Sequence, residues 1–416
     1  MKIFQILCIV IAVIYATTDL KAQEKKITLE VEQITAGPKH HLFGYIGHAL
    51  TIPWNKSERY IVSLQTDFYK RMPQKGEAAD IILIDTKNDY KIIPVDKTYA
   101  WNLQQGTMLY WNPNSPETQF FFNDLDLETG LVFTVLYDIE KRERIREYRF
   151  ENESVANGGV APGGKCFAGI NYGKISHSRE IISYAGAKDF GREGPANPDN
   201  DGLFKVSIET GAKELLVSYK TLAELFDIPE DYPIYVHHTL WNRNSDRIAF
   251  IVRGKGEGKY PNGACVIHSD GTGLERIKKG GHPEWLDGNI LSVAGEGGVE
   301  LYDVDTKLLE GTIGDTGTFP NPGDDKAYSP DRKWFVVAHK AHTRAEKRNY
   351  IFYRFSDQVH FNTPMIPTYY GAGQASVTRI DGAPRWNRES NKILVGGVAD
   401  DGSRQLFIIR IQPENE

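Results

Sequence analysis

The chain has 416 residues and a net charge of −6, with 40% hydrophobic and 25% charged residues, as in an ordinary water-soluble protein. This balance excludes a global basic field, so we expect neither nucleic acid nor a membrane surface as a partner. The 39 glycines, 20 prolines, 21 tyrosines and 19 phenylalanines favour short strands and tight turns, which predicts an all-β fold. Cys166 and Cys265 show no zinc-binding spacing, and a disulfide between them is not indicated.

The first 22 residues have the pattern of a secretory signal peptide. One early lysine precedes an apolar run over 3–16, and Ala22 supplies the small residue before a cut at Gln23. The run is too short to span a bilayer, and Cys8 lies inside it, where a lipid anchor is not expected. We therefore expect a soluble periplasmic or secreted protein whose mature chain, 23–416, is one domain.

One motif recurs along the chain from residue 54 onward. It begins with an aromatic or small residue, continues through a turn cluster of Asn, Ser, Pro, Asp or Gly, and ends in a β-branched and aromatic run. Its seven copies are WNKSERYIVSL (54–64), WNPNSPETQFFF (111–122), APGGKCFAGI (161–170), WNRNSDRIAFIV (241–252), WLDGNILSVAG (285–295), YSPDRKWFVVAH (328–339) and WNRESNKILVGG (386–397). Each copy predicts a strand, a tight turn and a second strand.

A second repeated segment follows every copy of the first and again predicts a hairpin, turning on Asp/Glu-Thr or Asp-Gly. Its copies occupy 79–94, 130–150, 202–218, 263–279, 299–314, 350–358 and 404–413. Two hairpins in each of seven units predict a seven-bladed β-propeller with four strands per blade. The last hairpin is short, so residues 27–34 are expected to add the strand that closes the ring. The insertion over 172–200 is expected to be a loop over one face, and a closed ring predicts a monomer.

The first strand of each blade should line the central channel, so residues at equal distances before the repeat aromatic should face one another. Three residues before that aromatic, consecutive repeats place His238, His282 and Asp325. Two imidazoles and a carboxylate at one level predict a divalent-cation site, for calcium, manganese or zinc. The alternative is a hydrogen-bonded polar ring around channel water. His237 alternates with His238 and is expected to face the blade instead.

His48 and Gln105 each lie six residues before a repeat tryptophan. Both therefore stand at the beginning of an inner strand, near one mouth of the channel. Gly47 and Ala49 leave room for a ligand to approach the backbone beside His48, and Tyr45 adds a titratable group to the same segment. A packed or surface loop histidine is the alternative interpretation of His48.

With these repeats, the segments YVHHTLWN (235–242) and GGHPEWLDG (280–288) resemble the propeller lyases of oligogalacturonate. The run GPKHHLFGYIGHALTIPWNKSERY (37–60) is more similar to a related propeller family that acts on L-rhamnose-α-1,4-D-glucuronate, the capping disaccharide of arabinogalactan side chains. Members of that family are α-L-rhamnosidases or rhamnosyl-glucuronate lyases. The resemblance covers nearly the whole mature chain and implies that His48, which matches the family's catalytic histidine, is catalytic here.

The resemblance has one departure. Oligogalacturonate lyases carry a Gln-x-x-His-x-His cluster before the repeat that corresponds to YSPDRKW, where this chain has PNPGDDKAYSP (320–330). His238 and His282 match metal-ligating histidines of that family, but a cation here would need Asp325 or Asp324 as a replacement ligand. The departure argues against a lyase of the pectin type.

Two mechanisms fit a histidine beside a glucuronate. In β-elimination a base removes the C5 proton, a positive group neutralises the carboxylate, and rhamnose leaves from O4. In hydrolysis an acid and a base act at the anomeric carbon of rhamnose. Arg332, Arg344 and Arg385 are the candidates for the carboxylate, with surface salt bridges as their alternative role, and Tyr45 and Gln105 are candidates for the sugar.

The main prediction is therefore an enzyme that releases terminal rhamnose from a glucuronate-containing oligosaccharide or polysaccharide. Two alternatives stay open on the sequence. One is an oligogalacturonate lyase, and the other is a non-catalytic periplasmic binding propeller.

Overall fold

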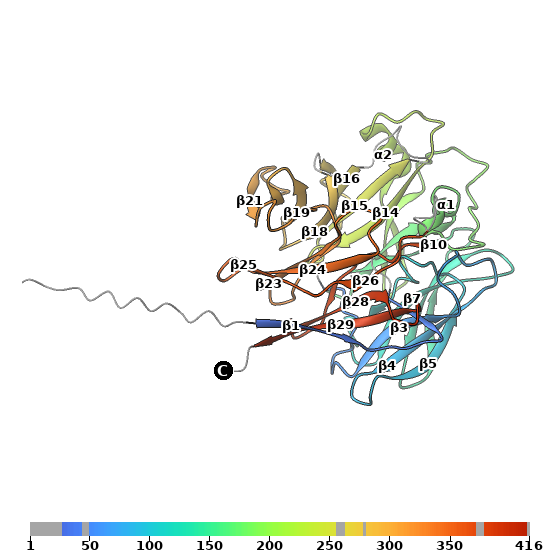
Figure 1. Cartoon of the computed structure of the whole chain (residues 1–416). Coiled ribbons are helices and arrows are strands. Elements are labelled where there is room, and N and C mark those ends of the chain that lie inside the picture. Colours follow the sequence, from blue (N-terminus) through green and yellow to red (C-terminus); the bar gives the residue numbers. More distant parts are fainter. Residues whose placement is uncertain (1–26, 44–49, 255–262, 278–279, 372–377, 414–416) are drawn as a thin grey trace, which may run out of the picture.

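The computed structural model describes residues 27–43, 50–254, 263–277, 280–371 and 378–413. Within these residues the strands form seven antiparallel sheets arranged around a centre (Figure 1), which confirms the predicted seven-bladed β-propeller. The predicted signal segment lies outside the described residues. Among the described helices, none is long and apolar enough to cross a membrane.

Blades 2, 3 and 4 follow the predicted hairpins closely, whereas in blade 1 the inner strand ends at Leu42 and Trp54 makes only an isolated bridge with Ile61. Blade 1 contains β2 (His40–Leu42), β3 (Tyr60–Thr66), β4 (Ala79–Asp85) and β5 (Lys91–Thr98). Blade 2 contains β6 (Tyr110–Trp111), β7 (Gln119–Leu125), β8 (Val132–Asp138) and β9 (Glu143–Tyr148). Blade 3 contains β10 (Val155–Val160), β11 (Cys166–Asn171), β12 (Gly202–Ser207) and β13 (Lys213–Ser218). Blade 4 contains β14 (Ile234–Trp241), β15 (Arg247–Gly254), β16 (Gly263–His268) and β17 (Glu275–Ile277).

The remaining three blades complete the ring. Blade 5 contains β18 (Gly280–Trp285), β19 (Ile290–Gly295), β20 (Gly298–Asp303) and β21 (Leu309–Ile313). Blade 6 contains β22 (Lys326–Tyr328), β23 (Trp334–His339), β24 (Lys347–Arg354) and β25 (Val359–Asn362), and β26 (Ile366–Pro367) also pairs with β24. Blade 7 contains β27 (Arg385–Trp386), β28 (Lys392–Val398), β29 (Arg404–Pro413) and β1 (Ile27–Gln33).

The two ends of the chain close the ring in blade 7, as predicted. Strand β1 pairs antiparallel with β29 along its whole length, from Ile27 opposite Pro413 to Gln33 opposite Phe407, and Figure 1 shows the two strands side by side. A strand from the N-terminal end thus completes a sheet whose other three strands come from the C-terminal end. The first and last parts of the chain therefore fold as one sheet.

The repeated tryptophans join each blade to the one before it. Each of four buried indoles donates a hydrogen bond from Nε1 to a backbone carbonyl of the preceding blade, which lies near the end of the inner strand or, in blade 1, just before Trp54. The bonds run from Trp111 to Pro53 at 2.7 Å, from Trp241 to Gly159 at 2.9 Å, from Trp285 to Leu240 at 2.8 Å, and from Trp386 to Ala327 at 3.2 Å. The indole thus fills the space between blades and satisfies a buried backbone group at once.

The asparagine after the tryptophan closes the turn into the second strand. Its Oδ1 accepts the backbone N–H groups that the turn leaves unpaired, for example from Tyr60 to Asn55 at 2.9 Å and from Lys392 to Asn387 at 3.0 Å. Asparagine suits this position because its short side chain bonds its own turn backbone. In the Trp-Asn repeat, the tryptophan therefore connects neighbouring blades and the asparagine closes the turn.

The insertion over 172–200 differs from the expected loop. It contains the short helices α1 (Tyr172–Ser176) and η1 (Glu180–Ile182), and a later helix, α2 (Tyr219–Leu225), follows blade 3. The buried rings of Tyr172 and Tyr184 stack with centroids 4.5 Å apart, and the Tyr172 hydroxyl donates to the carbonyl of Asn157 at 2.9 Å. The insertion is thus part of the hydrophobic core.

Both described cysteines, Cys166 and Cys265, are buried free thiols. Burial raises the pKa of Cys166 to about 11 and that of Cys265 to about 12. A thiol with so high a pKa carries little thiolate at neutral pH, so neither cysteine is a reactive nucleophile.

Replacing Trp285 by Phe should lower the free energy of unfolding by about 1–3 kcal/mol more than replacing Trp54 by Phe. Both substitutions remove the same volume from a fully buried site. The Trp285 change also leaves the Leu240 carbonyl without its donor, whereas Trp54 Nε1 has no partner within the described residues. Denaturant unfolding of the two variants measures the difference, and equal losses would contradict the role given to the indole hydrogen bond.

Candidate functional site

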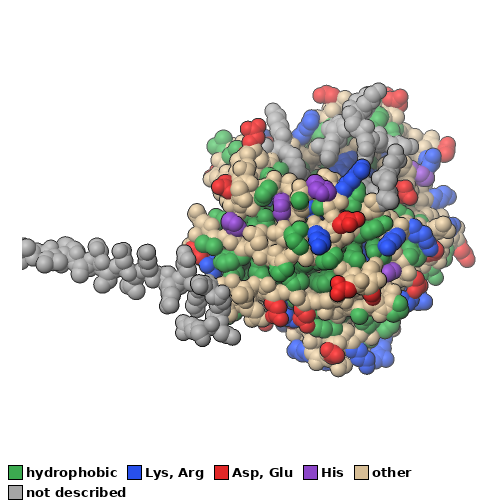
Figure 2. Space-filling model, in the orientation of Figure 1, with side chains coloured by type: hydrophobic (Ala, Val, Ile, Leu, Met, Phe, Trp, Pro, Cys, Tyr) green, Lys and Arg blue, Asp and Glu red, His purple; other side chains and the backbone are tan. Residues whose placement is uncertain are grey.

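A cavity of about 630 Å³ lies at one mouth of the channel, between blades 5, 6 and 7. Its walls come from β18, from the segments that precede β22 and β27, from the end of β23 and the loop that follows it, and from β24. We call it the cationic cavity, because its lining includes His282, Lys340, His342, Arg348 and Arg379 together with Asp324, Asp325, Asp381 and Tyr370. The face drawn in Figure 2 instead carries basic and acidic side chains interspersed, as the net charge of −6 suggests.

Arg348 is the most unusual group of the cationic cavity. Its side chain on β24 is completely buried, and Nη2 donates to the Ile380 carbonyl at 2.6 Å. Within the described residues, Nε and Nη1 have no hydrogen-bond partner. A buried guanidinium is costly unless anions offset its charge, and the carboxylates of Asp324 and Asp325 already act on it. Arg348 is thus a buried cation behind the wall of the cavity, whose field would also act on an acidic ligand.

The backbone of Gly382 packs directly against the guanidinium of Arg348. A Cβ at this position would lie 2.7 Å from Nη1 of Arg348 and 2.3 Å from Cβ of Ala338, both too close for a real side chain. Only glycine lets the backbone of this segment approach the guanidinium so closely.

Two more cations surround the same space. Burial lowers the pKa of Lys340, and the positive charge of Arg348 lowers it further. Arg379 bonds Asp381, with its Nε 2.6 Å from Oδ1. Three positive groups and three carboxylates, Asp324, Asp325 and Asp381, thus line a partly enclosed cavity, where charges are screened less by water than at the open surface.

His282 and Asp325 form a pair at the wall of the cavity. Nδ1 of His282 lies 3.2 Å from Oδ1 of Asp325, and Oδ2 of Asp325 accepts the backbone N–H groups of Gly382 and Ala383 at 3.0 and 3.2 Å. Burial alone would raise the pKa of Asp325, but its contacts with His282 and Ala383 hold that pKa well below its usual range. The ionised carboxylate therefore orients an imidazole that is 36% exposed.

His238 stands directly behind this pair. A bulge in β14 gives His238 a φ of +53° and shifts the pairing with β15 between His237 and Leu240. The bulge breaks the expected alternation, so the rings of His237 and His238 lie with centroids 4.3 Å apart and share a hydrogen bond between their Nδ1 atoms. The ring of His238 is also nearly parallel to that of His282, at 14° and 5.4 Å.

The predicted cation ligands His238, His282 and Asp325 thus do lie close together. The two imidazole rings are stacked, and Asp325 pairs with His282. In the part of the chain that the structure describes, no group of three or more His, Cys, Asp or Glu side chains is placed to hold a metal ion. Burial lowers the pKa values of His237 and His238 well below the usual range, so both imidazoles are neutral. A cation would need ligands beyond His238, His282 and Asp325, and the metal site stays a prediction.

The three arginines predicted to bind the carboxylate lie in different places. Arg344 is exposed beside the cationic cavity, with its guanidinium 6.0 Å from the ring of Tyr370. Arg385 is buried in the channel and donates to the Pro384 carbonyl at 2.8 Å. Arg332 lies after β22, at the far end of that strand from Asp325, and pairs with Asp287 at 2.5 Å. Only Arg344 borders the site.

Of the site residues predicted in the first two blades, the structure describes Gln105. His48 and Tyr45 lie outside the described residues. Gln105 is buried in the turn after Trp101, where its backbone N–H bonds Oδ1 of Asn102 at 2.7 Å. Its neighbour Gln104, rather than Gln105 itself, lines a smaller cavity.

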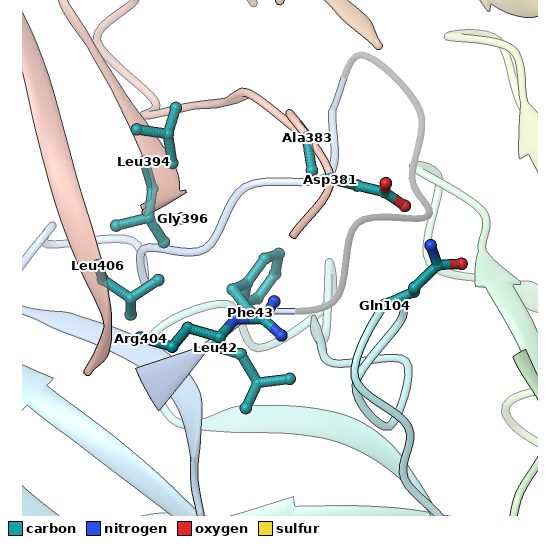
Figure 3. A pocket seen from close by; sticks show the side chains of 10 residues that line it. Leu42, Phe43, Gln104, Asp381, Ala383, Leu394, Gly396, Arg404 and Leu406 are labelled. Atoms are coloured by element: carbon teal, nitrogen blue, oxygen red, sulfur yellow. The ribbon is translucent and has the colours of Figure 1, made fainter. Parts of the chain in front are cut away.

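This smaller cavity touches the cationic one through Asp381, which lines both. Figure 3 shows the side chains of Phe43, Gln104, Asp381 and Arg404 around it. On the other side of His48, Leu50 lines a third cavity of about 210 Å³ with Tyr110 and Trp111. Phe43 and Leu50, the described residues on either side of residues 44–49, thus line different cavities.

Sequence reasoning missed Arg348, Lys340 and Arg379. The register argument used only the first strand of each blade, whereas Arg348 belongs to the third strand of blade 6 and Lys340 follows the second. The one signal in the sequence was an arginine at the beginning of a run, RNYIFYR (348–354), that otherwise reads as a buried strand.

The fold and the site together define a seven-bladed propeller with a cationic cavity at one mouth of its channel. No known family profile matches the chain, and no curated protein does. An oligogalacturonate lyase from Vibrio parahaemolyticus is similar in structure, with a TM-score of 0.61 over 92% of this chain and 96% of its own, at 13% identity. An oligogalacturonate lyase in complex with manganese gives 0.55 over 93% and 97%, at 12% identity. At these identities the similarity establishes the fold.

Replacing Asp325 by Asn should lower the free energy of unfolding by about 2–4 kcal/mol between pH 5 and 8, because the partners of a buried carboxylate lose its charge. Since the folded-state pKa of Asp325 is lowered, its stabilisation is present above the usual carboxyl pKa and is lost as the pH falls below it. The difference from the unsubstituted protein should therefore shrink below about pH 4.

Denaturant unfolding across this pH range measures the effect. Asp287→Asn, which breaks an exposed ion pair with Arg332, is the control and should cost less than about 1 kcal/mol. Equal costs for the two variants would contradict a structural role for the Asp325 carboxylate.

Proposed function

We propose that the chain is a lyase for uronate-containing glycans and that it releases L-rhamnose from L-rhamnose-α-1,4-D-glucuronate. The observation that carries the proposal is Arg348, fully buried at a large cavity with two donors that the described protein leaves unused. An acidic sugar in the cavity would place its carboxylate near Arg348 and Lys340. The identity of the leaving sugar rests on the resemblance of residues 37–60.

In the proposed reaction the glucuronate carboxylate binds Arg348 and Lys340, which stabilise the negative charge that develops as the C5 proton leaves. His282, oriented by Asp325, takes that proton. The C5–H electrons form the C4–C5 double bond while the C4–O4 bond breaks. Rhamnose leaves with the glycosidic oxygen, which takes up a proton from water, and the glucuronate becomes an unsaturated uronate.

Elimination fits the described residues better than hydrolysis does. Hydrolysis at the anomeric carbon of rhamnose needs no charge neutralisation at the uronate carboxylate, whereas elimination depends on it. In the cationic cavity that neutralisation would come from Lys340 and Arg348, since Arg379 already pairs with Asp381.

The direct test is incubation of the purified protein with rhamnosyl-glucuronate, following free rhamnose and absorbance near ~235 nm, where the conjugated carboxylate of the elimination product absorbs. The proposal predicts both signals. Rhamnose without absorbance would establish a hydrolase and contradict the elimination. An unsaturated product from oligogalacturonate alone would favour the oligogalacturonate lyase alternative. Turnover of neither substrate would favour a binding propeller.

Replacing Arg348 by Met should lower kcat/KM for the disaccharide at least about 100-fold, because the carboxylate loses its bidentate partner in the transition state. Arg149→Met is the matched control, since it removes an arginine that pairs with Glu147 and Asp126 on blade 2, away from the cavity. Thermal unfolding of both variants establishes that they are folded. Full activity in folded Arg348→Met would show that the uronate binds elsewhere.

Replacing His282 by Gln should lower kcat at least about 100-fold and change KM only a few-fold, because the glutamine keeps a polar group at the wall but cannot take the proton. His48→Ala is the companion variant, since the resemblance assigns the catalytic role to His48. Retained activity in His282→Gln with complete loss in His48→Ala would move the proton transfer to His48 and contradict the assignment of His282.

A further inference from the structure

Blade 1 meets blade 7 at the junction that closes the ring, where β2 lies beside β29. Within the described residues Trp54 Nε1 has no hydrogen-bond partner at this junction, unlike the indoles of Trp111, Trp241, Trp285 and Trp386 at theirs. A buried polar network connects the two blades here. Its members come from the segment after β1, from β2, from β3 and from β29, so it holds the two ends of the chain together.

Gln405 of β29 is the centre of this network, and its partners fix the orientation of its amide. The side chain is completely buried, and Nε2 donates to the Lys39 carbonyl at 2.9 Å and to Ser403 Oγ at 2.7 Å. Oε1 accepts from Thr35 Oγ1 at 2.6 Å and lies 2.7 Å from Nδ1 of His41. Because Oε1 can only accept, Nδ1 of His41 carries a proton and donates it to this bond.

His41 of β2 is buried as well, and its second ring nitrogen also has a partner. Nε2 lies 2.9 Å from Nε2 of Gln65 on β3, which donates to it. With Nδ1 as donor and Nε2 as acceptor, the imidazole makes both hydrogen bonds in its neutral form. A second proton, on Nε2, would face the donating amide group. A reversed Gln65 amide would restore the hydrogen bond, but it would bring no negative charge to the imidazolium.

The surroundings of His41 do not favour a positive charge. Burial lowers the pKa of His41, and the neighbouring His40 lowers that pKa further. The charged groups that face His40 and His41 from the surrounding elements are Lys39, Asp67, Lys70, Asp401 and Arg404. Both carboxylates have partners elsewhere, and within the described residues neither contacts the His41 ring. A proton on His41 would therefore leave a buried charge without a counter-ion.

We propose that this junction is an acid-sensitive latch, in which a proton on His41 weakens the attachment of β2 to β29. Because the pKa of His41 is lowered in the folded protein, the latch is stable above the unfolded value of about 6.5 and loses stability as the pH falls below it. Leu42, on the same strand, lines the smaller cavity together with Leu406 of β29 and with Asp381. Loosening of β2 therefore also loosens a wall that adjoins the cationic cavity. The latch needs no uronate and is independent of the proposed function.

Hydrogen exchange followed by mass spectrometry on the full chain, between about pH 5 and 7 and corrected for the intrinsic exchange rate, measures the opening of β2. Opening should increase by up to about tenfold for each pH unit below about 6.5, the slope that uptake of one proton gives. Strand β10, the inner strand of blade 3, contains no histidine and is the internal control. Against the effect of burial, hydrogen bonds with Lys392 and Arg410 hold the pKa values of Glu58 and Glu32 below the usual range, so these carboxyls of the same junction do not titrate here.

His41→Gln removes the titrating ring, so opening of β2 in this variant should agree within about twofold between pH 5 and 7. His360→Gln, which replaces an exposed histidine on β25, is the matched control and should keep the pH dependence. An unchanged pH dependence in His41→Gln would overturn the proposal. So would equal changes in β2 and β10 of the unsubstituted protein, a comparison that decides the question even if His41→Gln does not fold.

Discussion

The arrangement of the blades depends on the hydrogen bond from a repeat tryptophan to the backbone carbonyl that ends the preceding inner strand. Four blade junctions carry it, at Trp111, Trp241, Trp285 and Trp386. Because the donor is a side chain and the acceptor is backbone, the bond fixes both the distance between blades and their relative height. At the junction between blades 5 and 6 the repeat aromatic is Tyr328, and His282 and Asp325, each three residues before the aromatic of its blade, lie side by side there.

The same constraint has a cost at the mouth of the channel. The rigid inner strands converge there on a space that side chains do not fill, and charged groups line it. Arg348 and Lys340 lose water on burial, and described carboxylates such as Asp325 and Asp381 already have partners in His282 and Arg379. A ligand carboxylate would recover part of that desolvation cost. The site thus sacrifices stability for binding, as functional sites commonly do.

The fold could be predicted because its signals are local and repeated. Each repeat copy, four of them beginning with Trp-Asn, predicts its own hairpin, and seven copies predict the architecture. The same repeats predicted that His238, His282 and Asp325, each three residues before the repeat aromatic, lie at one height in the channel. Arg348 could not be found that way, since it reaches the cavity from a third strand, and the bulge at His238 changed the direction of His237 without any signal in the alternation. The role of His48 rests on resemblance alone, as it lies outside the described residues.

The most direct test of the central claim is an experimental structure of the protein bound to the rhamnosyl-glucuronate disaccharide. The account predicts that the glucuronate carboxylate lies in the cationic cavity beside Arg348 and Lys340, with C5 facing His282. A carboxylate bound instead in the cavity lined by Leu50, Tyr110 and Trp111 would contradict the account and move the active site to that cavity.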